Sequence, residues 1–472
     1  MTVTAAAKDP LRASDALAAL ARFTATTRFD DLPAAVVGKA GHHLLDTLGA
    51  ALAGADSVES TALLRMLTTT EPGADACVWG TGVALSPRGA ALVNGVSAHA
   101  LELDDAGGCD HSGAVVVPAA LAAVAAAPAP VSGADLLTAV VVGYDVARRV
   151  LEACGGYWPH NEAGWHSTGT CGPFGAAAAA SAVLGLGVEQ TAHALALAGS
   201  FSGGIWAFVH DGAMSKRLHA GRAAEAGVTA ALLASHGVTG PGEVFGDVWG
   251  GFLRTLAPAS ADPAALTAGL GREWRISRCS LKPYASCRST HSSIDAVGAI
   301  LGTQRLTADD VAGIHVRLGP AVHGMCGGTD IATLPAAQLS LPYAVAARVV
   351  LGSAGLDAYD ADNRRSPHVS SVLERIVLEV DPSMDRDTEP VVTLTTRAGA
   401  VHRKQVTDPL GSATNPLDGQ AVTAKFHQLA SRTLPSAQTE ALADAVGHLD
   451  TLDDARTLVA LLGRPRPQED RT

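Results

Sequence analysis

The sequence predicts a mainly α-helical protein, in which a large all-helical domain carries an inserted, smaller α+β lid domain. Three observations support this fold class. The chain has 472 residues, enough for two or three domains. Its composition is 47% apolar but only 4% aromatic and includes 50 glycines, which favours closely packed helices over a β-sandwich. Apolar residues recur at helical spacing along most of the chain and alternate at strand spacing only in a later block.

The part of the chain before residue 273 predicts helices in succession, after a loose tail at residues 1–12. A strand-like, turn-rich segment is expected between Glu71 and Pro87. Residues 240–275 have the composition of a linker. The helices are expected at 15–21, 33–54, 88–101, 115–127, 132–153, 171–184, 188–198 and 216–234.

The pattern changes near Glu273, where strands become frequent. Strands are expected at 274–276, 313–318, 376–380 and 391–395, and helices at 290–301, 342–351, 420–431 and 438–449. We therefore predict a helical domain formed by residues 13–272 and 409–465, and an α+β lid domain formed by residues 273–408. A cleft between two domains is a common place for a small-molecule site.

Charge and cysteine usage exclude several classes of protein. The formal net charge of −12 argues against nucleic acid and against an anionic membrane surface as partners. The seven cysteines are scattered without a CxxC motif, which favours a reducing compartment and supports neither a disulfide scaffold nor a zinc site. The N-terminus lacks the apolar core of a signal peptide, and no apolar run approaches the length of a membrane span. We expect a cytoplasmic protein that does not bind a membrane.

The first polar stretch that interrupts the helices combines carboxylates with imidazoles. His99, Glu102, Asp104 and Asp105 are followed by Asp110 and His111. These groups can supply acid–base catalysis, or they can be metal ligands, although typical ligand spacing is missing. They can equally be a chance cluster in a helix cap and loop.

Three further stretches carry imidazoles and cations. His166 lies in a loop of small residues before an Ala-rich helix, where it can also be a capping or core residue. Lys216, Arg217 and His219 lie where a loop becomes a helix, a position that suits an anion or is simply a solvated basic helix start. The fourth stretch, at the start of the lid domain, holds Lys282, Cys287, Arg288 and His291. Its charges suit a cationic lid over an anion held by the other domain.

Six segments together resemble the MmgE/PrpD family, in the same order and over nearly the whole chain. The family includes 2-methylcitrate dehydratase, cis-aconitate decarboxylase and iminodisuccinate epimerase. The resemblance implies a cofactor-independent enzyme, usually a homodimer, with a helical domain and a lid domain. The segments are ALVNGVSAHALELDD, HSGAVVVPAALAA, GWHSTGTCGPFGAAAAA, MSKRLHAGRAAEAGVTAALLA, LKPYASCRSTH and DPLGSATNPLDGQAVTAKF.

The resemblance also implies site residues. Carried over from the decarboxylase, the site carboxylate falls on Glu102, the imidazoles fall on His111 and His166, and the lysines fall on Lys216 and Lys282. The chain departs from the decarboxylase where a threonine is replaced by Ala106, where the lid histidine is replaced by Cys287, and where GPAVHGMCGGTD lacks a tyrosine. These departures argue against cis-aconitate decarboxylase and leave the dehydratase and the epimerase open.

Reactions of this family begin by removing a proton from carbon next to a carboxylate, so fixed cations must face the resulting intermediate. We predict a hydro-lyase that dehydrates a small hydroxy-di- or tricarboxylate, similar to 2-methylcitrate dehydratase. The alternatives are an epimerase of a small dicarboxylate and a non-catalytic protein that binds a metabolite. We predict no metal and no cofactor. The predicted catalytic residues are His166, His111, Lys216, Lys282 and Glu102, and the predicted substrate-binding residues are Asp105, Arg217, His219, Cys287, Arg288 and His291.

Overall fold

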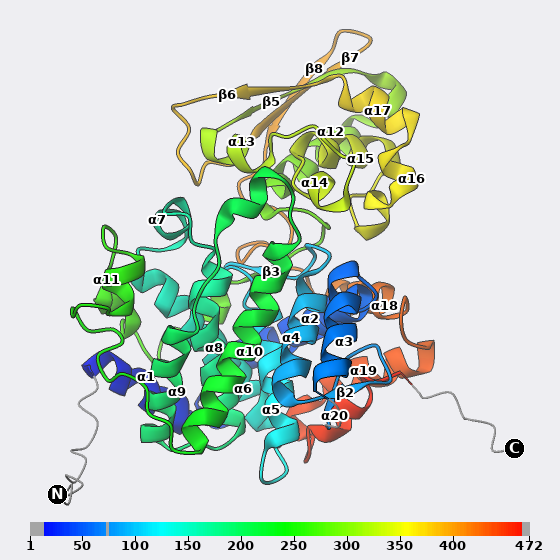
Figure 1. The fold of residues 1–472 in the computed structure, drawn as a ribbon. Coiled ribbons are helices and arrows are strands. Elements are labelled where there is room, and N and C mark those ends of the chain that lie inside the picture. Colours follow the sequence, from blue (N-terminus) through cyan, green and yellow to red (C-terminus); the bar gives the residue numbers. More distant parts are fainter. Residues whose placement is uncertain (1–13, 72–74, 465–472) are drawn as a thin grey trace, which may run out of the picture.

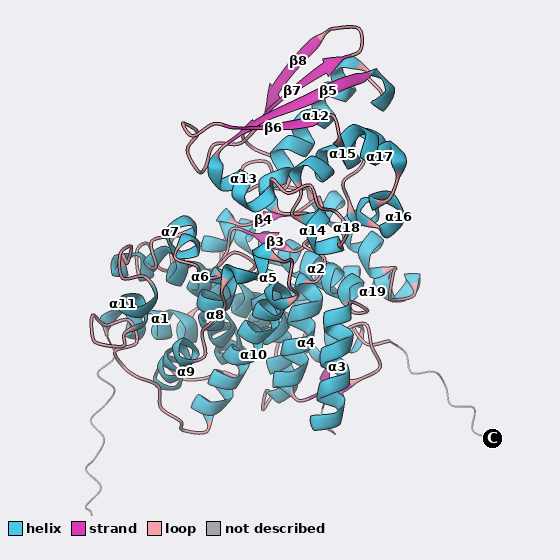
Figure 2. Ribbon diagram, turned by 45° about the horizontal axis from the view of Figure 1, so that its top comes forward, coloured by secondary structure: helices cyan, strands magenta, loops and turns pink. Residues whose placement is uncertain are grey.

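The computed structural model of the chain describes residues 14–71 and 75–464, and they form a helical body below a smaller α+β lid (Figure 1). The predicted fold class is confirmed. The predicted tail at residues 1–12 and the outer limits of the predicted helical domain, residues 13 and 465, lie outside the described residues. Figure 2 shows the strands of the lid gathered at the end of the molecule farthest from the body.

The body contains the helices from the first part of the chain and those from its end. Its helices are α1 (Asp15–Thr26), α2 (Ala34–Gly54), α3 (Val58–Thr70), α4 (Pro87–His99), α5 (Gly113–Ala126), α6 (Gly133–Ala153), α7 (Tyr157–Glu162), α8 (Ser167–Val183), α9 (Val188–Ser200), α10 (Ser215–Ser235), α11 (Phe252–Leu256), α18 (Gly419–Ala430), α19 (Ser436–Gly447) and α20 (Arg456–Ala460). Because α18 packs on α2, and Phe426 is fully buried there, the last part of the chain contributes to the core of the body. The domain boundaries themselves remain a prediction.

Small residues let three helices of the body approach until their backbones touch. Helix α10 packs against α4 on one side and α8 on the other. A Cβ atom added at Gly221 would lie 2.2 Å from the carbonyl oxygen of Leu92, and one added at Gly227 would lie 2.2 Å from the Cβ of Ala176. The Ala- and Gly-rich composition therefore reflects close helix packing, as the sequence predicts.

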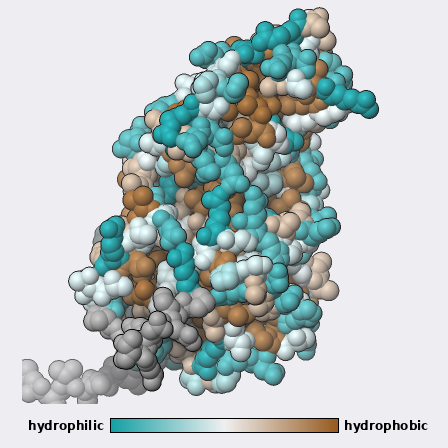
Figure 3. Space-filling model, turned by 90° about the vertical axis from the view of Figure 1, so that its right-hand side faces the viewer, coloured by the Kyte–Doolittle hydropathy of each residue, from teal (hydrophilic) through white to brown (hydrophobic). Residues whose placement is uncertain are grey.

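The lid is built on a four-stranded sheet with helices on one face. The strand order is β6-β5-β7-β8, with β5 parallel to β6 and antiparallel to β7, and β7 antiparallel to β8. On the side of the molecule seen in Figure 3, apolar side chains gather on the lid. The elements of the lid are α12 (His291–Gln304), β5 (Val311–Leu318), α13 (Pro320–Cys326), α14 (Leu334–Gln338), α15 (Leu341–Leu351), α16 (Ala361–Arg364), α17 (Pro367–Leu373), β6 (Ile376–Val380), β7 (Val391–Thr396) and β8 (Val401–Gln405).

Two local predictions are wrong. Residues 274–276 do not form a strand, because Arg275–Arg278 is a 3-10 helix whose Ile276 is buried against the body. The segment 240–275 is not a linker, since Phe245, Phe252 and Leu253 are buried in the main core. Alternation over three residues is too short to distinguish a strand from a turn that packs on a core.

Two very short ladders complete the body. Strand β1 (Ala76–Cys77) pairs with β2 (Ala84–Leu85) within the expected strand-like segment. Strand β3 (Asp105–Ala106) pairs with β4 (Ser280–Leu281), so the loop after α4 lies beside the start of the lid sequence. This second ladder brings the first and the fourth polar stretches together.

Candidate active site

The site begins at the end of α4, where the chain reverses direction. The helix starts at Pro87 with a cap from Ser86, whose Oγ accepts from the backbone N–H of Gly89 at 3.1 Å. After the helix ends, Glu102 adopts a left-handed backbone conformation with φ of 53°. A non-glycine residue at positive φ is uncommon and often belongs to a functional site. Here it coincides with a carboxylate that is almost completely buried.

Two buried lysines from distant segments meet the carboxylate of Glu102. Lys216, in the first turn of α10, donates to Oε1. Lys282, directly after β4, lies 3.3 Å from Oε2 and also donates to the backbone oxygen of Glu102 at 3.3 Å. Burial acts to raise the pKa of Glu102, but the two ammonium groups outweigh it and hold that pKa well below its usual range. The trio therefore places two ammonium groups and one carboxylate at a single buried point.

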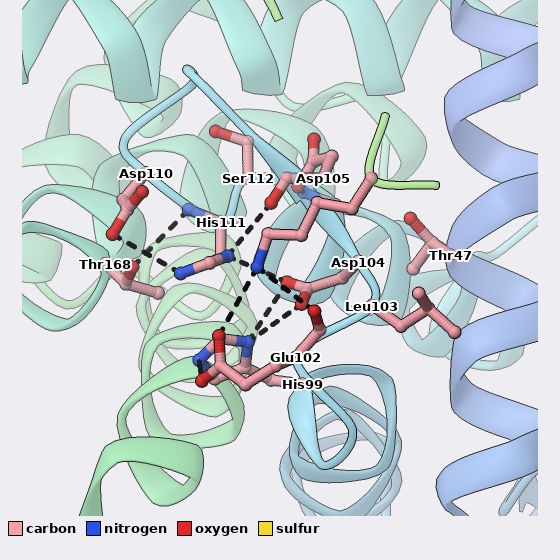
Figure 4. Close-up of polar contacts among 12 residues, drawn as sticks. Thr47, His99, Glu102, Leu103, Asp104, Asp105, Asp110, His111, Ser112 and Thr168 are labelled. Carbon is pink, nitrogen blue, oxygen red and sulfur yellow. Dashed lines mark hydrogen bonds and ion pairs between the residues drawn. The ribbon is translucent and has the colours of Figure 1, made fainter. Parts of the chain in front are cut away.

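Asp104 joins two histidines next to this trio. Its Oδ1 lies 3.0 Å from Nδ1 of His99, and its Oδ2 lies 3.1 Å from Nδ1 of His111. Figure 4 shows His111 between Asp104 and Asp110. The Nδ1 of His111 also lies 2.9 Å from the backbone oxygen of Asp105, so this nitrogen faces two acceptors and must carry a proton.

The pKa values of His99 and His111 shift in opposite directions. Burial acts to lower the pKa of His111, but Asp110 and Asp104 outweigh burial, and that pKa is raised. Burial lowers the pKa of His99 to about 4 in spite of Asp104. His111, with its Nε2 3.3 Å from Asp110, is therefore the imidazole of this pair that is protonated near neutral pH.

His166 lies behind Asp110. Its Nε2 is 3.9 Å from Oδ2 of Asp110, and its Nδ1 is 2.9 Å from Nδ1 of His219. Burial is the main cause that lowers the pKa of His166 well below its usual value and that of His219 to about 4, so both rings are neutral near pH 7. One ring must then donate to the other, which fixes their tautomers.

A cavity of about 480 Å³ opens between the body and the lid beside these groups. Apolar side chains, including Trp158, Trp206 and Met325, form part of its wall. Among the predicted site residues, those that line it are Glu102, His111, Lys216, Lys282, Cys287 and Arg288. The structure therefore brings residues of three of the predicted stretches into one wall.

The thiol of Cys287 faces the same cavity. Its hydrogen bond with Cys326 lowers its pKa, burial acts in the opposite direction, and Lys216 and Lys282 lower it further, to about 6. These neighbours favour the thiolate form of Cys287, while the same pairing and burial raise the pKa of Cys326 well above its usual value. Its neighbour Arg288 lies 3.1 Å from the carboxylate of Glu389, so its charge is compensated within the lid.

The other predicted site residues lie outside the lining of this cavity. The carboxylate of Asp105 is 3.1 Å from Nδ1 of His43 and accepts from the backbone N–H of Gly113 at 2.9 Å. Arg217 donates to the backbone oxygen of Ala100 at 2.9 Å. The remaining two are His219, which contacts His166, and His291, which begins α12. Their predicted contact with a substrate, like that of His166, remains a prediction.

Several cavity residues were not predicted. Trp158 on α7 donates from its indole nitrogen to Asp387 of the lid at 2.9 Å, and Arg386 lies 2.8 Å from Glu162 of the body. Both contacts join the lid loop before β7 to α7, and the residues involved, apart from Glu162, line the cavity. No motif or spacing marks them in the sequence. Asp104, which binds His99 and His111, was not among the predicted site residues either. Its position next to Asp105, in a stretch of acidic residues, is a signal that could have identified it.

Two donor sets at the site have metal-ligand geometry: His99 with Glu102 and His111, and Asp110 with His111 and His166. In each set the ligand atoms lie within 4.8 Å of one another. The first set, however, shares Glu102 with two lysines, whose charge opposes a cation there. The arrangement around Glu102 suits a carboxylate ligand better than a metal ion.

No helix within the described part of the chain has both the length and the apolar character needed to cross a membrane.

Residues 18–263 match the MmgE/PrpD N-terminal domain, and residues 284–451 match the MmgE/PrpD C-terminal domain.

Similar proteins in fungi and animals cover almost the whole chain. A cis-aconitate decarboxylase-like protein oryM of Aspergillus oryzae is 29% identical over 485 residues, covering 98% of this chain and 99% of that protein. A cis-aconitate decarboxylase of Aspergillus terreus is 28% identical, covering 92% of this chain and 93% of its own. The human cis-aconitate decarboxylase is 29% identical, covering 92% of each chain.

Proposed function

The chain belongs to the MmgE/PrpD family of enzymes, and from this premise we propose that it is a cofactor-independent lyase that dehydrates a small hydroxy-di- or tricarboxylate. The observation that carries the proposal is the meeting of Glu102, Lys216 and Lys282 at the wall of the cavity beside His111. Two buried ammonium groups at the cavity wall can pair with the carboxylates of a substrate, which favours a polycarboxylate over a neutral ligand.

The lysines supply the charge that the intermediate requires. Removal of a proton from carbon next to a carboxylate adds a second negative charge to that carboxylate and its neighbouring carbon, and fixed ammonium groups in a site of low dielectric stabilise it. Lys216 and Lys282 are held in place by Glu102, so they need little reorganisation when the charge develops. In this scheme Glu102 orients the two ammonium groups and does not transfer a proton.

His111 is the proposed general acid. Its pKa is raised by Asp110 and Asp104 in spite of burial, which favours the protonated form, and it lines the cavity. In dehydration it would give a proton to the hydroxyl group, which then leaves as water while the electron pair of the carbanion forms the double bond. Asp104 and Asp110 would hold the ring and stabilise its positive charge. His166 lies on the other side of Asp110 from His111, so it would influence His111 only indirectly, by helping to position the Asp110 carboxylate.

Cys287 is the proposed base. Its lowered pKa provides a thiolate near neutral pH, and it lines the same cavity as His111. The thiolate would take the proton from the carbon next to a substrate carboxylate, and the carbon would be left with the electron pair. Dehydration requires both a base and an acid, so this pairing favours it over decarboxylation, which needs no base. Epimerisation also requires both groups, and the substrate panel below separates the two.

Decarboxylation of cis-aconitate is the second candidate, because the similar proteins carry this activity in their names. Loss of carbon dioxide leaves the electron pair on carbon, so it needs an acid and cations but no base. His111 and the two lysines would be sufficient for it. Two positions of the cavity wall, Ala106 and Cys287, nevertheless differ from the decarboxylase residues that the resemblance implies.

A substrate panel separates the candidates. Purified protein is incubated with hydroxy-di- and tricarboxylates, amino-dicarboxylates and cis-aconitate in D₂O. Proton NMR follows alkene formation, deuterium exchange and the decarboxylated product, and evolved carbon dioxide is measured separately. New alkene from a hydroxy acid supports the dehydratase, and carbon dioxide from cis-aconitate supports the decarboxylase. Exchange without alkene supports an epimerase, and no reaction at all supports a protein that only binds a metabolite. Asp362→Asn, at a fully exposed carboxylate on the lid, serves as the control variant.

A Cys287→Ser variant tests the assignment of the base. If Cys287 takes the proton, this variant should lose dehydration at least about 100-fold and should also lose deuterium exchange. If the reaction is decarboxylation, the same variant should keep most of its rate, because that reaction needs no base.

The expected homodimer is a separate proposal, which light scattering after size-exclusion chromatography can test.

A further inference from the structure

A second cluster of reactive side chains lies in the body, outside the lining of the cavity. Cys154 at the end of α6, His160 in α7 and Cys171 in α8 are all fully buried. One ligand atom from each, the two sulfur atoms and a ring nitrogen, lies within 4.8 Å of the others. The three side chains come from three consecutive helices, so their meeting is a product of packing.

The chain turns sharply to form this cluster. Directly after Cys154, Gly155 and Gly156 have φ of 91° and 87°, a left-handed conformation that favours glycine. This turn ends α6 and lets α7 begin at Tyr157, so that His160 folds back toward Cys154. Cys171 reaches the same point because α8 packs closely on α6.

Within the described part of the chain, the ring of His160 has a hydrogen-bond partner at one nitrogen and none at the other. Its Nε2 lies 2.7 Å from Oγ1 of Thr170, which fixes the ring. Its Nδ1 is buried and has no hydrogen-bond partner among residues 14–71 and 75–464. A buried polar atom without a partner is costly, and metal-bound histidines typically use their second nitrogen for a hydrogen bond of this kind.

We propose that Cys154, His160 and Cys171 bind a divalent thiophilic metal ion, with zinc as the expected ion. Two thiolates and one imidazole are typical zinc ligands. Two thiolates neutralise the charge of Zn²⁺, whereas a monovalent ion would leave a net negative charge buried in an apolar core. The described residues supply three such ligands, and the fourth position is left to a water molecule or a neighbouring hydroxyl group.

Metal binding by cysteine is linked to proton release. The thiolate is the form of the side chain that binds a metal ion, so coordination displaces protons to solvent. The affinity should therefore increase with pH.

The proposed role of the ion is structural, because none of its three ligands lines the cavity. It would join α6, α7 and α8 at one point. Helix α7 carries Tyr157 and Trp158, which form part of the cavity wall, and Trp158 bonds to Asp387 of the lid. The ion would thus hold the wall that meets the lid. This role does not depend on which reaction the cavity supports.

The test uses the full chain, purified under a phosphine reductant, stripped with a chelator and titrated with Zn²⁺ or Co²⁺. We expect about one ion per chain by elemental analysis and, with Co²⁺, thiolate-to-cobalt charge-transfer absorption in the near ultraviolet. This absorption distinguishes the proposed site from Asp110, His111 and His166, which contain no sulfur. Zinc should also raise the thermal unfolding midpoint of the stripped protein.

Variants complete the experiment. Cys154→Ser and Cys171→Ser should each weaken zinc binding by at least about 100-fold and abolish the charge-transfer absorption. Cys279→Ser, which changes an equally buried cysteine of the body, should bind like wild type. The proposal is overturned if stripped wild-type protein shows no thiolate absorption with Co²⁺. It is also overturned if Cys154→Ser retains zinc as tightly as Cys279→Ser.

Discussion

The buried charge on Glu102 makes a prediction that needs no substrate. Replacing Glu102 with glutamine keeps the size of the side chain and removes its charge, so Lys216 and Lys282 lose the carboxylate between them. The side chains of the two lysines are only 7% and 1% exposed, so solvent cannot replace that partner. Removing one member of a buried ion pair typically costs about 3–5 kcal/mol. We expect Glu102→Gln to lower the free energy of unfolding by about this amount at pH 7.

The pH dependence of this loss has a definite sign. The pKa of Glu102 in the folded state is well below its usual value, because the lysines outweigh the effect of burial. Such a carboxyl stabilises the fold above its unfolded pKa of about 4.3 and loses that contribution as the pH falls toward the folded pKa. The difference between wild type and Glu102→Gln should therefore be complete at pH 7 and should shrink below about pH 4.3.

Urea denaturation followed by circular dichroism measures both quantities. Asp362→Asn is the matched control: its carboxylate is 98% exposed and pairs with Arg365 at 2.9 Å, so we expect a change within about 0.5 kcal/mol. A loss under about 1 kcal/mol for Glu102→Gln at pH 7 would contradict the buried trio. A loss of the same size at pH 7 and well below pH 4 would contradict its assignment to the charge of the carboxylate.

Three further predictions concern activity and packing. Lys216→Ala should lower kcat/KM by at least about 100-fold, roughly 3 kcal/mol of transition-state stabilisation, in steady-state assays with the substrate found in the panel; a rate near wild type would remove Lys216 from the mechanism. If Cys287 is the base, kcat/KM should fall as the pH drops below about 6, and a pH–rate profile of wild type that is flat through this range would exclude it. Gly221→Ala should destabilise the protein by about 1–3 kcal/mol in urea, because the new Cβ meets the backbone of α4. Gly38→Ala, at a helical glycine with open space around it, should instead stabilise by about 0.5–1 kcal/mol, and equal effects of the two changes would refute the packing argument.

Local sequence patterns were sufficient for most of the helices. The helices expected at 188–198 and 216–234 correspond to Val188–Ser200 and Ser215–Ser235, because apolar spacing and the residues that stop a helix are properties of neighbouring residues. The prediction of strands was less reliable than that of helices. The expected strand at 376–380 is present, whereas residues 275–276 of the expected strand at 274–276 belong to a 3-10 helix, and the strand Val401–Gln405 was not predicted. A strand depends on a partner that its own residues do not specify.

Composition, local patterns and ordered motifs were enough to predict the fold class, the family and the polar stretches that contain the site. They could not show which members of those stretches meet, because that depends on how the chain packs. Lys216 and Lys282 follow Glu102 by 114 and 180 residues, and they reach it because β3 pairs with β4 and α10 packs on α4. Asp105 has the same chemistry as Glu102, yet its neighbours His43 and Gly113 hold it away from the cavity lining. The physical reason is that a residue's type sets what it can do, while burial and the charges around it are set by chain segments far away in the sequence.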